Sequence, residues 1–244
     1  MAFCCSGDAL KVAESDVCVV ITGKLEAQFI EPLIETYRLE DPKNKLVSTW
    51  NDQPTEFVEY LKKNGFTVIQ GEYPSHISSA NLQATSIHRG LVKAKDDGFK
   101  YAMRMRTDVA CNGETFQRLK RIVCSQLVKL QSGDVTSVNG QRLTILCGIE
   151  YNPQLRYYYD VLFASSLETM MKFFGVQQTP GDSRYVEKYW VETYSGKTNL
   201  TRDDLKEVFN FCLDGCRREG IEMQWLSKGY NIIRGYCGGY HIWV

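Results

Sequence analysis

Short β-rich runs alternate with amphipathic helical stretches over the first half of the chain. Val17 to Thr22 is continuously apolar, as a strand buried on both faces should be, and Gly23-Lys24 ends it. The alternation then predicts a helix at Leu25 to Tyr37, a strand at Lys45 to Trp50, a helix at Thr55 to Asn64, a strand at Phe66 to Ile69, a helix at Asn81 to Asp97 and a strand at Tyr101 to Met105. Such repeats indicate a mostly parallel sheet with helices on both faces, because parallel neighbours need crossover connections.

Ligands of such sheets bind beyond the carboxyl ends of the strands. Three segments follow predicted strands and should meet at that edge: Thr22-Gly23-Lys24, Thr49-Trp50-Asn51-Asp52 and Arg106-Thr107-Asp108. These segments are the first places to look for a binding site.

The pattern changes beyond Asn112, where the sheet is expected to become mixed. The predicted elements are a helix at Glu114 to Leu130, strands at Asp134 to Val138, Leu143 to Ile149 and Tyr157 to Ala164, helices at Ser166 to Phe174 and Asp203 to Arg218, and a loop at Thr179 to Arg184. No repeat, linker or low-complexity segment divides the chain. Residues 1–244 are therefore predicted to form one α/β domain with a mixed, mostly parallel sheet flanked by helices.

The composition is that of an ordinary globular protein, with 43% hydrophobic and 24% charged residues. Lys plus Arg equals Asp plus Glu at 29 each, so no overall field attracts nucleic acid or an anionic membrane. We therefore expect no nucleic-acid partner. An anionic ligand must be met by local groups, where Arg lies beside Asp in an apolar strand.

Nine cysteines at irregular spacing fit a reducing compartment better than a disulfide framework. Cys18 and Cys147 lie in apolar strand-like runs, where free thiols pack as small hydrophobes. Cys212 and Cys216 lack a second Cys/His pair at a metal spacing, so they do not indicate structural zinc. No signal-peptide pattern and no run of about 18 apolar residues is present. A cytoplasmic protein without a transmembrane segment is expected, in the host cytoplasm if the source is viral.

Asp108 is the most informative residue, because a carboxylate just after a buried strand lies at the ligand edge of the sheet. There it could hold a divalent ion against a diphosphate. Arg104 and Arg106 alternate with two Met residues, so both Arg side chains project on one face, where guanidinium groups suit phosphate or carboxylate oxygens. A buried structural Arg–Asp pair is the alternative.

Several well-known sites are missing from the sequence. There is no GxGxxG or GxxxxGK[ST] phosphate cradle, no GxSxG elbow and no HExxH, and only three His residues are present. The absence of these motifs disfavours a dehydrogenase, a P-loop kinase, a serine hydrolase or a metalloprotease.

A longer set of residues carries a family resemblance. Its parts are Ser48-Thr49-Trp50, Asn81-Leu82-Gln83, Arg106-Thr107-Asp108, Asp160-Val161-Leu162-Phe163 and Glu187-Lys188-Tyr189-Trp190. In this order, over roughly residues 17 to 195, the sequence resembles the WavE-type family of lipopolysaccharide-synthesis glycosyltransferases, which have a GT-A-like domain. The family's usual setting is bacterial envelope polysaccharide biosynthesis.

The resemblance implies a role for each matched position. In a GT-A fold an Asp-x-Asp motif binds the metal and the diphosphate, and Arg106-Thr107-Asp108 takes its place, with Arg106 where the first Asp would be. A divalent ion, Mn²⁺ or Mg²⁺, is implied at Asp108, yet Arg106 could itself neutralise a phosphate. His241 is a candidate to complete the coordination, although a lone His is more often an ordinary surface or packed residue.

The remaining candidates divide between donor binding and proton transfer. Asp160 or Glu187 would take the acceptor proton in an inverting enzyme. Arg89, on the helix before the Asp108 strand, could reach the nucleotide or simply lie on a solvated helix face. The expected donor-binding residues are Thr22, Gly23, Trp50, Asn81, Arg89, Arg104, Arg106 and Asp108.

The predicted function is a glycosyltransferase that moves a sugar from a nucleotide-sugar donor to a hydroxyl of a glycan acceptor. The alternative is a catalytically silent nucleotide- or carbohydrate-binding domain of the same fold. A nucleotidyltransferase would need a Gly-rich basic loop after the first strand, and only Gly23-Lys24 is present there.

Overall fold

The computed structural model describes residues 11–132, 146–147, 151–152, 157–158, 162–184, 186–196, 198 and 221–233. Its centre is a six-stranded sheet in the order β3-β2-β1-β4-β9-β6. The first four of these strands are β3 (Thr67–Gly71), β2 (Lys45–Trp50), β1 (Val17–Thr22) and β4 (Tyr101–Arg106), and they are mutually parallel. Antiparallel pairing adds β9 (Phe163–Ser166) to β4 and β6 (Leu146–Cys147) to β9. The predicted fold class, a mixed and mostly parallel sheet flanked by helices, is confirmed.

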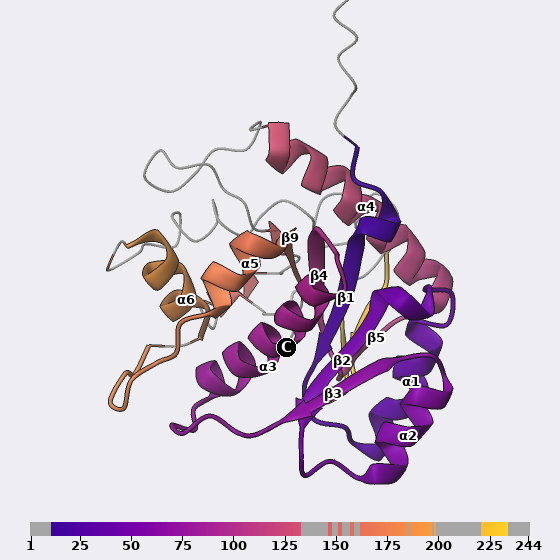
Figure 1. Cartoon of the computed structure of the whole chain (residues 1–244), viewed down its shortest axis with the longest axis horizontal. Coiled ribbons are helices and arrows are strands. Elements are labelled where there is room, and N and C mark those ends of the chain that lie inside the picture. The colour runs from indigo at the N-terminus through magenta and orange to yellow at the C-terminus, as the bar shows by residue number, and fades with distance from the viewer. Residues whose placement is uncertain are drawn as a thin grey trace, which may run out of the picture.

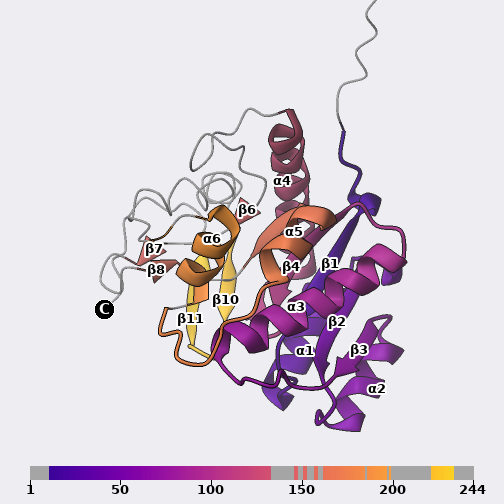
Figure 2. The ribbon, with the colours of Figure 1, turned by 60° about the vertical axis from the view of Figure 1, so that its left-hand side comes forward.

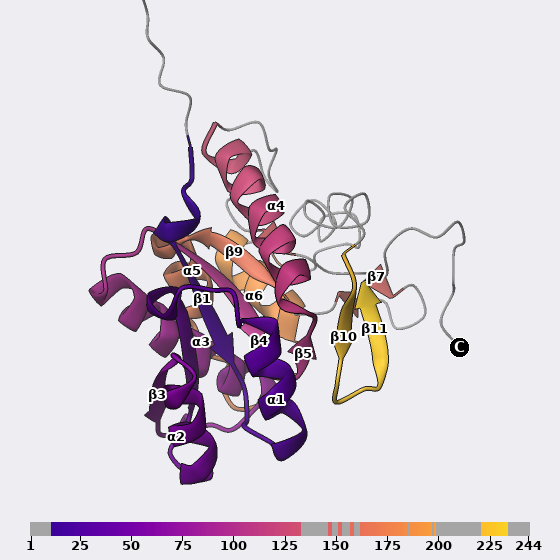
Figure 3. The same cartoon turned by 90° about the vertical axis from the view of Figure 1, so that its right-hand side faces the viewer.

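Helices cover both faces of this sheet (Figures 1 and 3). On one face lie α1 (Ala27–Thr36), α2 (Thr55–Lys63) and α4 (Gly113–Ser132), where α1 contacts both of the others. On the other lie α3 (Ser79–Asp96), α5 (Leu167–Phe174) and α6 (Val186–Ser195), with α3 packed on β1 and β2. Two 3-10 turns, Glu14–Asp16 and Pro42–Asn44, precede β1 and β2. This is the layering that the β-α-β pattern predicts.

The elements predicted up to residue 132 occur where the pattern places them, with ends that move by a few residues. The strands at Val17–Thr22 and Lys45–Trp50 have the predicted bounds, and both are buried along their whole length. The continuous apolar character of Val17–Thr22 therefore reflects burial on both faces, whereas Lys45–Trp50 buries polar residues as well. Helix α3 begins earlier than predicted, because the Ser78 side chain caps it by accepting from the backbone N–H of Asn81.

A second, antiparallel sheet was not predicted. It consists of β5 (Val109–Ala110), β10 (Met223–Trp225) and β11 (Tyr230–Ile233), in the order β11-β10-β5. Figures 2 and 3 show the β10–β11 hairpin beside the central layers, although it comes from the far end of the chain. Because β5 begins directly after Asp108, this sheet adds a wall next to the predicted ligand edge.

The strand predicted over Tyr157 to Ala164 is wrong as one element. Tyr157–Tyr158 forms β8, which pairs with β7 (Tyr151–Asn152), while Phe163–Ser166 forms β9 in the central sheet. The residue pattern of this stretch does not reveal that its two ends pair with different partners. The predicted strand at Asp134 to Val138 and the predicted helix at Asp203 to Arg218 lie outside the described residues.

Aromatic side chains fill the layer between β9, α5 and α6. Phe163 lies 5.1 Å from Phe174 and 5.9 Å from Trp190, ring centroid to centroid, in edge-to-face arrangements. Trp190 and Phe174 meet at 4.8 Å. This cluster packs behind β9, the strand that pairs with β4, and so holds in place the strand that carries the two candidate arginines.

The described cysteines that are free are Cys18, Cys111 and Cys124. Burial raises the pKa of Cys18 and Cys111 to about 12 and that of Cys124 to about 11. These thiols therefore stay protonated near neutral pH and pack as small hydrophobes, as predicted for Cys18.

Candidate functional site

A cleft of about 290 Å³ opens at the carboxyl ends of β1, β2 and β4, against the first turns of α3. This is the edge at which sheets of this kind bind ligands. Six of the predicted donor-binding residues line it together: Thr22, Gly23, Trp50, Arg104, Arg106 and Asp108. The sequence prediction thus brought together residues from three strand ends that share one hollow.

Gly23 shapes the floor where the β1 and β4 ends approach each other. Its φ is +144°, and a Cβ at this position would lie 2.3 Å from Thr107 Oγ1. The Thr107 backbone N–H donates to the Thr22 carbonyl at 3.1 Å, and Thr49 Oγ1 donates to the Gly23 carbonyl at 2.8 Å. A side chain at residue 23 would therefore push the two strand ends apart.

Arg106 and Asp108 form a two-point ion pair at the cleft. Arg106 Nε donates to Asp108 Oδ1 at 2.8 Å, and Nη2 donates to Oδ2 at 3.0 Å. Ser227 Oγ also donates to Oδ2, at 2.6 Å, and the Leu226 backbone N–H donates to the Asp108 carbonyl at 2.8 Å. The carboxylate is thus held from two sides, by its own strand end and by the turn after β10.

Arg104 lies deeper in the same wall, and only 1% of the residue is exposed. Its Nε donates to Thr22 Oγ1 at 3.0 Å, and its Nη2 donates to Gln83 Oε1 at 3.2 Å. The guanidinium carbon lies 5.9 Å from the centre of the Phe163 ring. Thr22 and Gln83 are neutral, so these two hydrogen bonds position the guanidinium without cancelling its charge.

Trp50 contributes to the cleft wall but is packed within the protein. The Tyr73 ring stacks on it at 4.5 Å with an interplanar angle of 18°, and the guanidinium carbon of Arg89 lies 5.0 Å from the indole centre. Tyr73 is itself held by Asp52, whose carboxylate accepts its hydroxyl at 2.8 Å. This hydrogen bond is the main reason that the Asp52 pKa is lowered. Trp50 is therefore a rigid wall with 3% of its surface exposed.

The cleft carries an excess of positive charge. Among the described residues that line it, Lys24, Arg104 and Arg106 are cationic and Glu26 and Asp108 are anionic, which leaves a net charge of +1. The total formal charge of the chain is zero, so the cleft is more positive than the chain as a whole. Such an arrangement suits an anionic ligand.

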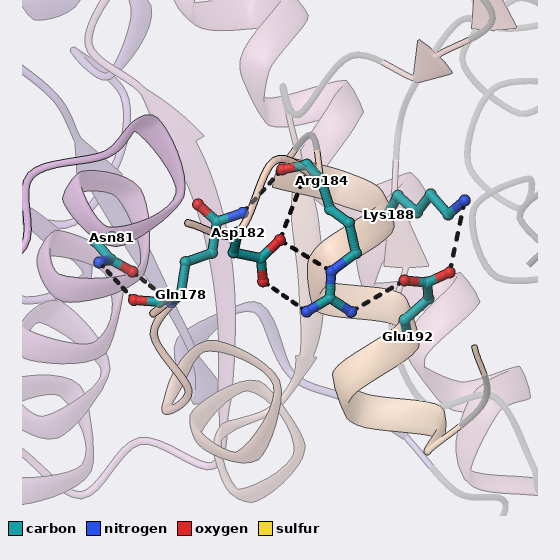
Figure 4. A network of polar contacts seen from close by, with 6 residues as sticks. All are labelled: Asn81, Gln178, Asp182, Arg184, Lys188 and Glu192. Atoms are coloured by element: carbon teal, nitrogen blue, oxygen red, sulfur yellow. Dashed lines mark hydrogen bonds and ion pairs between the residues drawn. The ribbon is translucent and has the colours of Figure 1, made fainter. Parts of the chain in front are cut away.

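Asn81 does not line the cleft, although the sequence suggested donor contact. It is fully buried, and its Nδ2 donates to the carbonyls of His76 at 2.8 Å and Gln178 at 3.0 Å. Its Oδ1 accepts the backbone N–H of Gln178 at 2.6 Å (Figure 4). Both amide donors are used within the protein, so Asn81 joins two loops to the start of α3, the helix that walls the cleft.

The loop that Asn81 holds continues into a second ion-pair cluster. Figure 4 shows the Arg184 guanidinium between Asp182 and Glu192, with Lys188 beyond Glu192. Arg184 Nε and Nη2 donate to the two Asp182 oxygens at 3.0 and 2.6 Å, and Nη1 donates to Glu192 Oε2 at 3.1 Å. The hydrogen bond to Arg184 is the largest cause of a lowered Asp182 pKa. None of these residues lines the cleft.

Arg89 also lies away from the donor cleft. It lines a separate hollow with residues of β3, α3 and the end of α5. The solvated helix face that was its alternative is not found either, since its three guanidinium nitrogens are buried.

Three further predicted residues receive no side-chain description. Asp160 and His241 lie outside the described residues, and Glu187 lies in α6 with a side chain that the structure leaves undescribed. Their proposed roles in proton transfer and metal binding stay predictions.

The chemistry of the described residues does not fit a divalent ion at Asp108. Both carboxylate oxygens already accept hydrogen bonds, from Arg106 and Ser227. Within the described ranges, no three His, Cys, Asp or Glu side chains gather where a metal could be held.

Sequence reasoning missed the partners that complete the cleft. Ser227 contacts Asp108 across 119 positions of sequence, and nothing in its own surroundings marks it. Gln83 was visible only as part of the Asn81-Leu82-Gln83 resemblance, yet it is the residue of that motif that contacts an arginine of the cleft.

No helix in the described ranges has the length and apolar character needed to cross a membrane.

No family model matches the chain, and no curated protein matches it in sequence. A mannose-1-phosphate geranyltransferase structure from Thermus thermophilus aligns at 12% identity and a TM-score of 0.44, over 78% of this chain and 67% of that one. A nucleoside-diphosphate-sugar pyrophosphorylase from Vibrio cholerae aligns at 11% identity and a TM-score of 0.40, over 68% and 82%.

Proposed function

We propose that the chain is a glycosyltransferase that moves a sugar from a nucleotide-sugar donor to a hydroxyl of a glycan acceptor. One observation carries the proposal: Arg104, Arg106 and Asp108 meet in a cationic cleft at the carboxyl edge of a parallel sheet. The ordered sequence resemblance to WavE-type enzymes supports the same reading, because its Arg106-Thr107-Asp108 segment lies at this cleft.

Glycosyl transfer needs compensation for the negative charge that grows on the departing diphosphate. Arg104 and Arg106 are suited to this role, because both guanidinium groups are already oriented by hydrogen bonds. A fixed cation needs no reorganisation as the sugar leaves, which is the property that favours the transition state. In this proposal the diphosphate lies against these two arginines.

The role proposed for Asp108 follows from its contacts. A bare carboxylate repels a diphosphate, so Asp108 acts through Arg106, whose guanidinium it fixes by two hydrogen bonds. In this proposal the oriented Arg106 guanidinium contacts the diphosphate where the resemblance would place Mn²⁺ or Mg²⁺, while Arg104 and Lys24 supply the positive charge that the Arg106–Asp108 pair does not. Ser227 keeps the carboxylate in place from the opposite side.

Acceptor activation belongs to a separate residue in this proposal. Asp160 and Glu187 remain the candidates for taking the acceptor proton, as the resemblance implies. Glu187 lies in α6, on the same side of the sheet as α3.

A thermal-shift panel of nucleotide sugars tests the proposal. Ligand binding to the folded state raises its stability by about 2.7 kcal/mol at a hundredfold excess over Kd. We expect UDP- or GDP-activated sugars to raise the Tm of the wild-type chain with and without manganese, and Asp108→Ala to weaken this response. Stabilisation by free sugars and by no nucleotide would instead favour a silent carbohydrate-binding domain.

A further inference from the structure

A second hollow, of about 280 Å³, lies against the middle of α3 and the end of β3. It shares no lining residue with the donor cleft. The polar side chains that line it are Glu72, Thr85, His88, Arg89 and Gln177, so it holds one carboxylate beside its one guanidinium. The hollow is therefore a separate place on the molecule with polar walls of its own.

Arg89 is the unusual group in this hollow. Its Nε, Nη1 and Nη2 are all buried, and none has a hydrogen-bond partner among the described residues. Burial lowers its pKa, but an arginine stays charged in proteins at physiological pH. Buried charged groups are almost always hydrogen-bonded, because an unpaired charge inside a protein is strongly unfavourable. A guanidinium left in this state points to a missing partner.

The backbone is shaped to hold this guanidinium. A Cβ at residue 71 would lie 1.8 Å from Arg89 Nη1, so only glycine admits the group at this depth. On the indole of Trp50, the guanidinium carbon lies 5.0 Å from the ring centre. These two contacts fix the position of the charge without satisfying its N–H groups.

The neighbouring polar groups can accommodate an anion. Burial lowers the pKa of His88, so its ring is neutral near pH 7 and carries one N–H donor. Gln177 Nε2 donates to Thr85 Oγ1 at 2.5 Å, which leaves the Thr85 hydroxyl proton to be donated elsewhere. Glu72, the carboxylate at the rim, accepts from Asn51 Nδ2 at 2.5 Å and has no hydrogen bond to Arg89.

We propose that this hollow binds an oxyanion, a phosphate or carboxylate group, with Arg89 as its cation and Thr85 and His88 as neutral donors. Charge-assisted hydrogen bonds from a guanidinium to such a group are short and strong. The hollow shares no lining residue with the donor cleft, although Trp50, which walls the cleft, also contacts Arg89, and the proposal does not rest on glycosyl transfer. Its ligand is either a free phosphate or an acidic group carried on a sugar.

Histidine ring NMR signals test the proposal directly. The chain has three histidines, so His88→Gln assigns the signal of the ring that lines the hollow. Titration with inorganic phosphate or glucuronate should shift the His88 signal, whereas glucose should not. Tighter binding of phosphate would identify a free-phosphate site, and tighter binding of glucuronate would identify a site for an acidic sugar.

Two matched variants distinguish the loss of the Arg89 contact from the general effect of removing one positive charge from the protein. Arg89→Met keeps most of the packing volume and should weaken the preferred anion by about tenfold or more, as expected for losing a charge-assisted contact. Arg38→Met should leave the response unchanged, because Arg38 is paired on the surface with Glu35 and Glu114.

Thr85→Val removes a hydroxyl from the hollow without touching the arginine, and it should also weaken binding. It carries the test if Arg89→Met fails to fold. The proposal is overturned if no oxyanion shifts the His88 signal, if Arg89→Met responds as the wild type does, or if Thr85→Val binds with unchanged affinity.

Discussion

Two arginine–aspartate pairs in this molecule have nearly the same local geometry and very different surroundings. Arg106 and Asp108, like Asp182 and Arg184, are two residues apart and joined through Nε and Nη2 of the arginine. The aspartate side chains are equally covered, at 9% exposure each, while the arginines are 23% and 38% exposed. The local hydrogen-bond geometry therefore does not distinguish the two pairs, although the order of the two residues along the chain is reversed.

Their surroundings do distinguish them. Arg184 is shared between two carboxylates, Asp182 and Glu192, and lies 4.9 Å from the Tyr189 ring, in a loop with no part in the cleft. Arg106 instead lies at the carboxyl edge of the parallel sheet, in a cleft with a net positive charge. Whether an Arg–Asp ion pair belongs to a binding site therefore depends on its position in the fold. The Asp182–Arg184 pair is accordingly the natural control for the Arg106–Asp108 pair.

The largest predicted difference between the pairs is in catalysis. Asp108→Ala should lower the turnover of an accepted nucleotide sugar by about a hundredfold or more, because it releases the cation that faces the diphosphate. Asp182→Ala should change turnover by less than about twofold. Steady-state kinetics of both variants measures this, and equal losses would erase the distinction.

A smaller effect is expected where the loop of the control pair meets α3. Asn81→Ala leaves the Gln178 backbone N–H and two carbonyls without their buried partner. We expect the free energy of unfolding to fall by about 2 kcal/mol. Urea denaturation checks this value. A change below about 0.5 kcal/mol would show that the amide does not join these loops in solution.

The smallest effect concerns the control pair itself and its dependence on pH. The Asp182 pKa is lowered below its ordinary value of 3.8, chiefly by its hydrogen bond to Arg184. A lowered folded-state pKa contributes stability above the unfolded value, and this contribution disappears as the pH falls through the folded value.

Asp182→Asn should therefore cost no more than about 1 kcal/mol at pH 7, since Arg184 is exposed to solvent. The difference in Tm between this variant and the wild type should shrink as the pH falls below 3.8. A difference that grows on acidification would contradict the assigned role of the pair.

The central fold could be predicted because the residue types of its strands indicate how deeply each strand is buried. Val17–Thr22 is almost entirely apolar and buried throughout, so its limits coincide with the limits of the pattern. Lys45–Trp50 is also buried throughout, although Lys45, Ser48 and Thr49 are polar. The two-residue period correctly placed Arg104 and Arg106 on one face, since both line the cleft.

The remainder depends on contacts between distant parts of the chain. The β10–β11 hairpin pairs with a two-residue strand, too short to show a pattern, and it brings Ser227 to Asp108. Asn81 was predicted to contact the donor because it belongs to the Asn81-Leu82-Gln83 segment of the family resemblance, and Arg89 because it lies on the helix before the Asp108 strand. Only the packing of the loop at Gln178 shows that the Asn81 amide is hydrogen-bonded within the protein. Only the packing against Gly71 shows that Arg89 faces another hollow.

The most direct test of the central claim is the affinity for a nucleoside diphosphate, measured by isothermal titration calorimetry on Arg106→Met and Arg184→Met. Both variants remove a guanidinium that is paired with an aspartate two residues away. We predict that UDP or GDP, whichever binds the wild type, binds Arg106→Met at least about tenfold more weakly and Arg184→Met with unchanged affinity. Unchanged binding to Arg106→Met would contradict the placement of the diphosphate in this cleft.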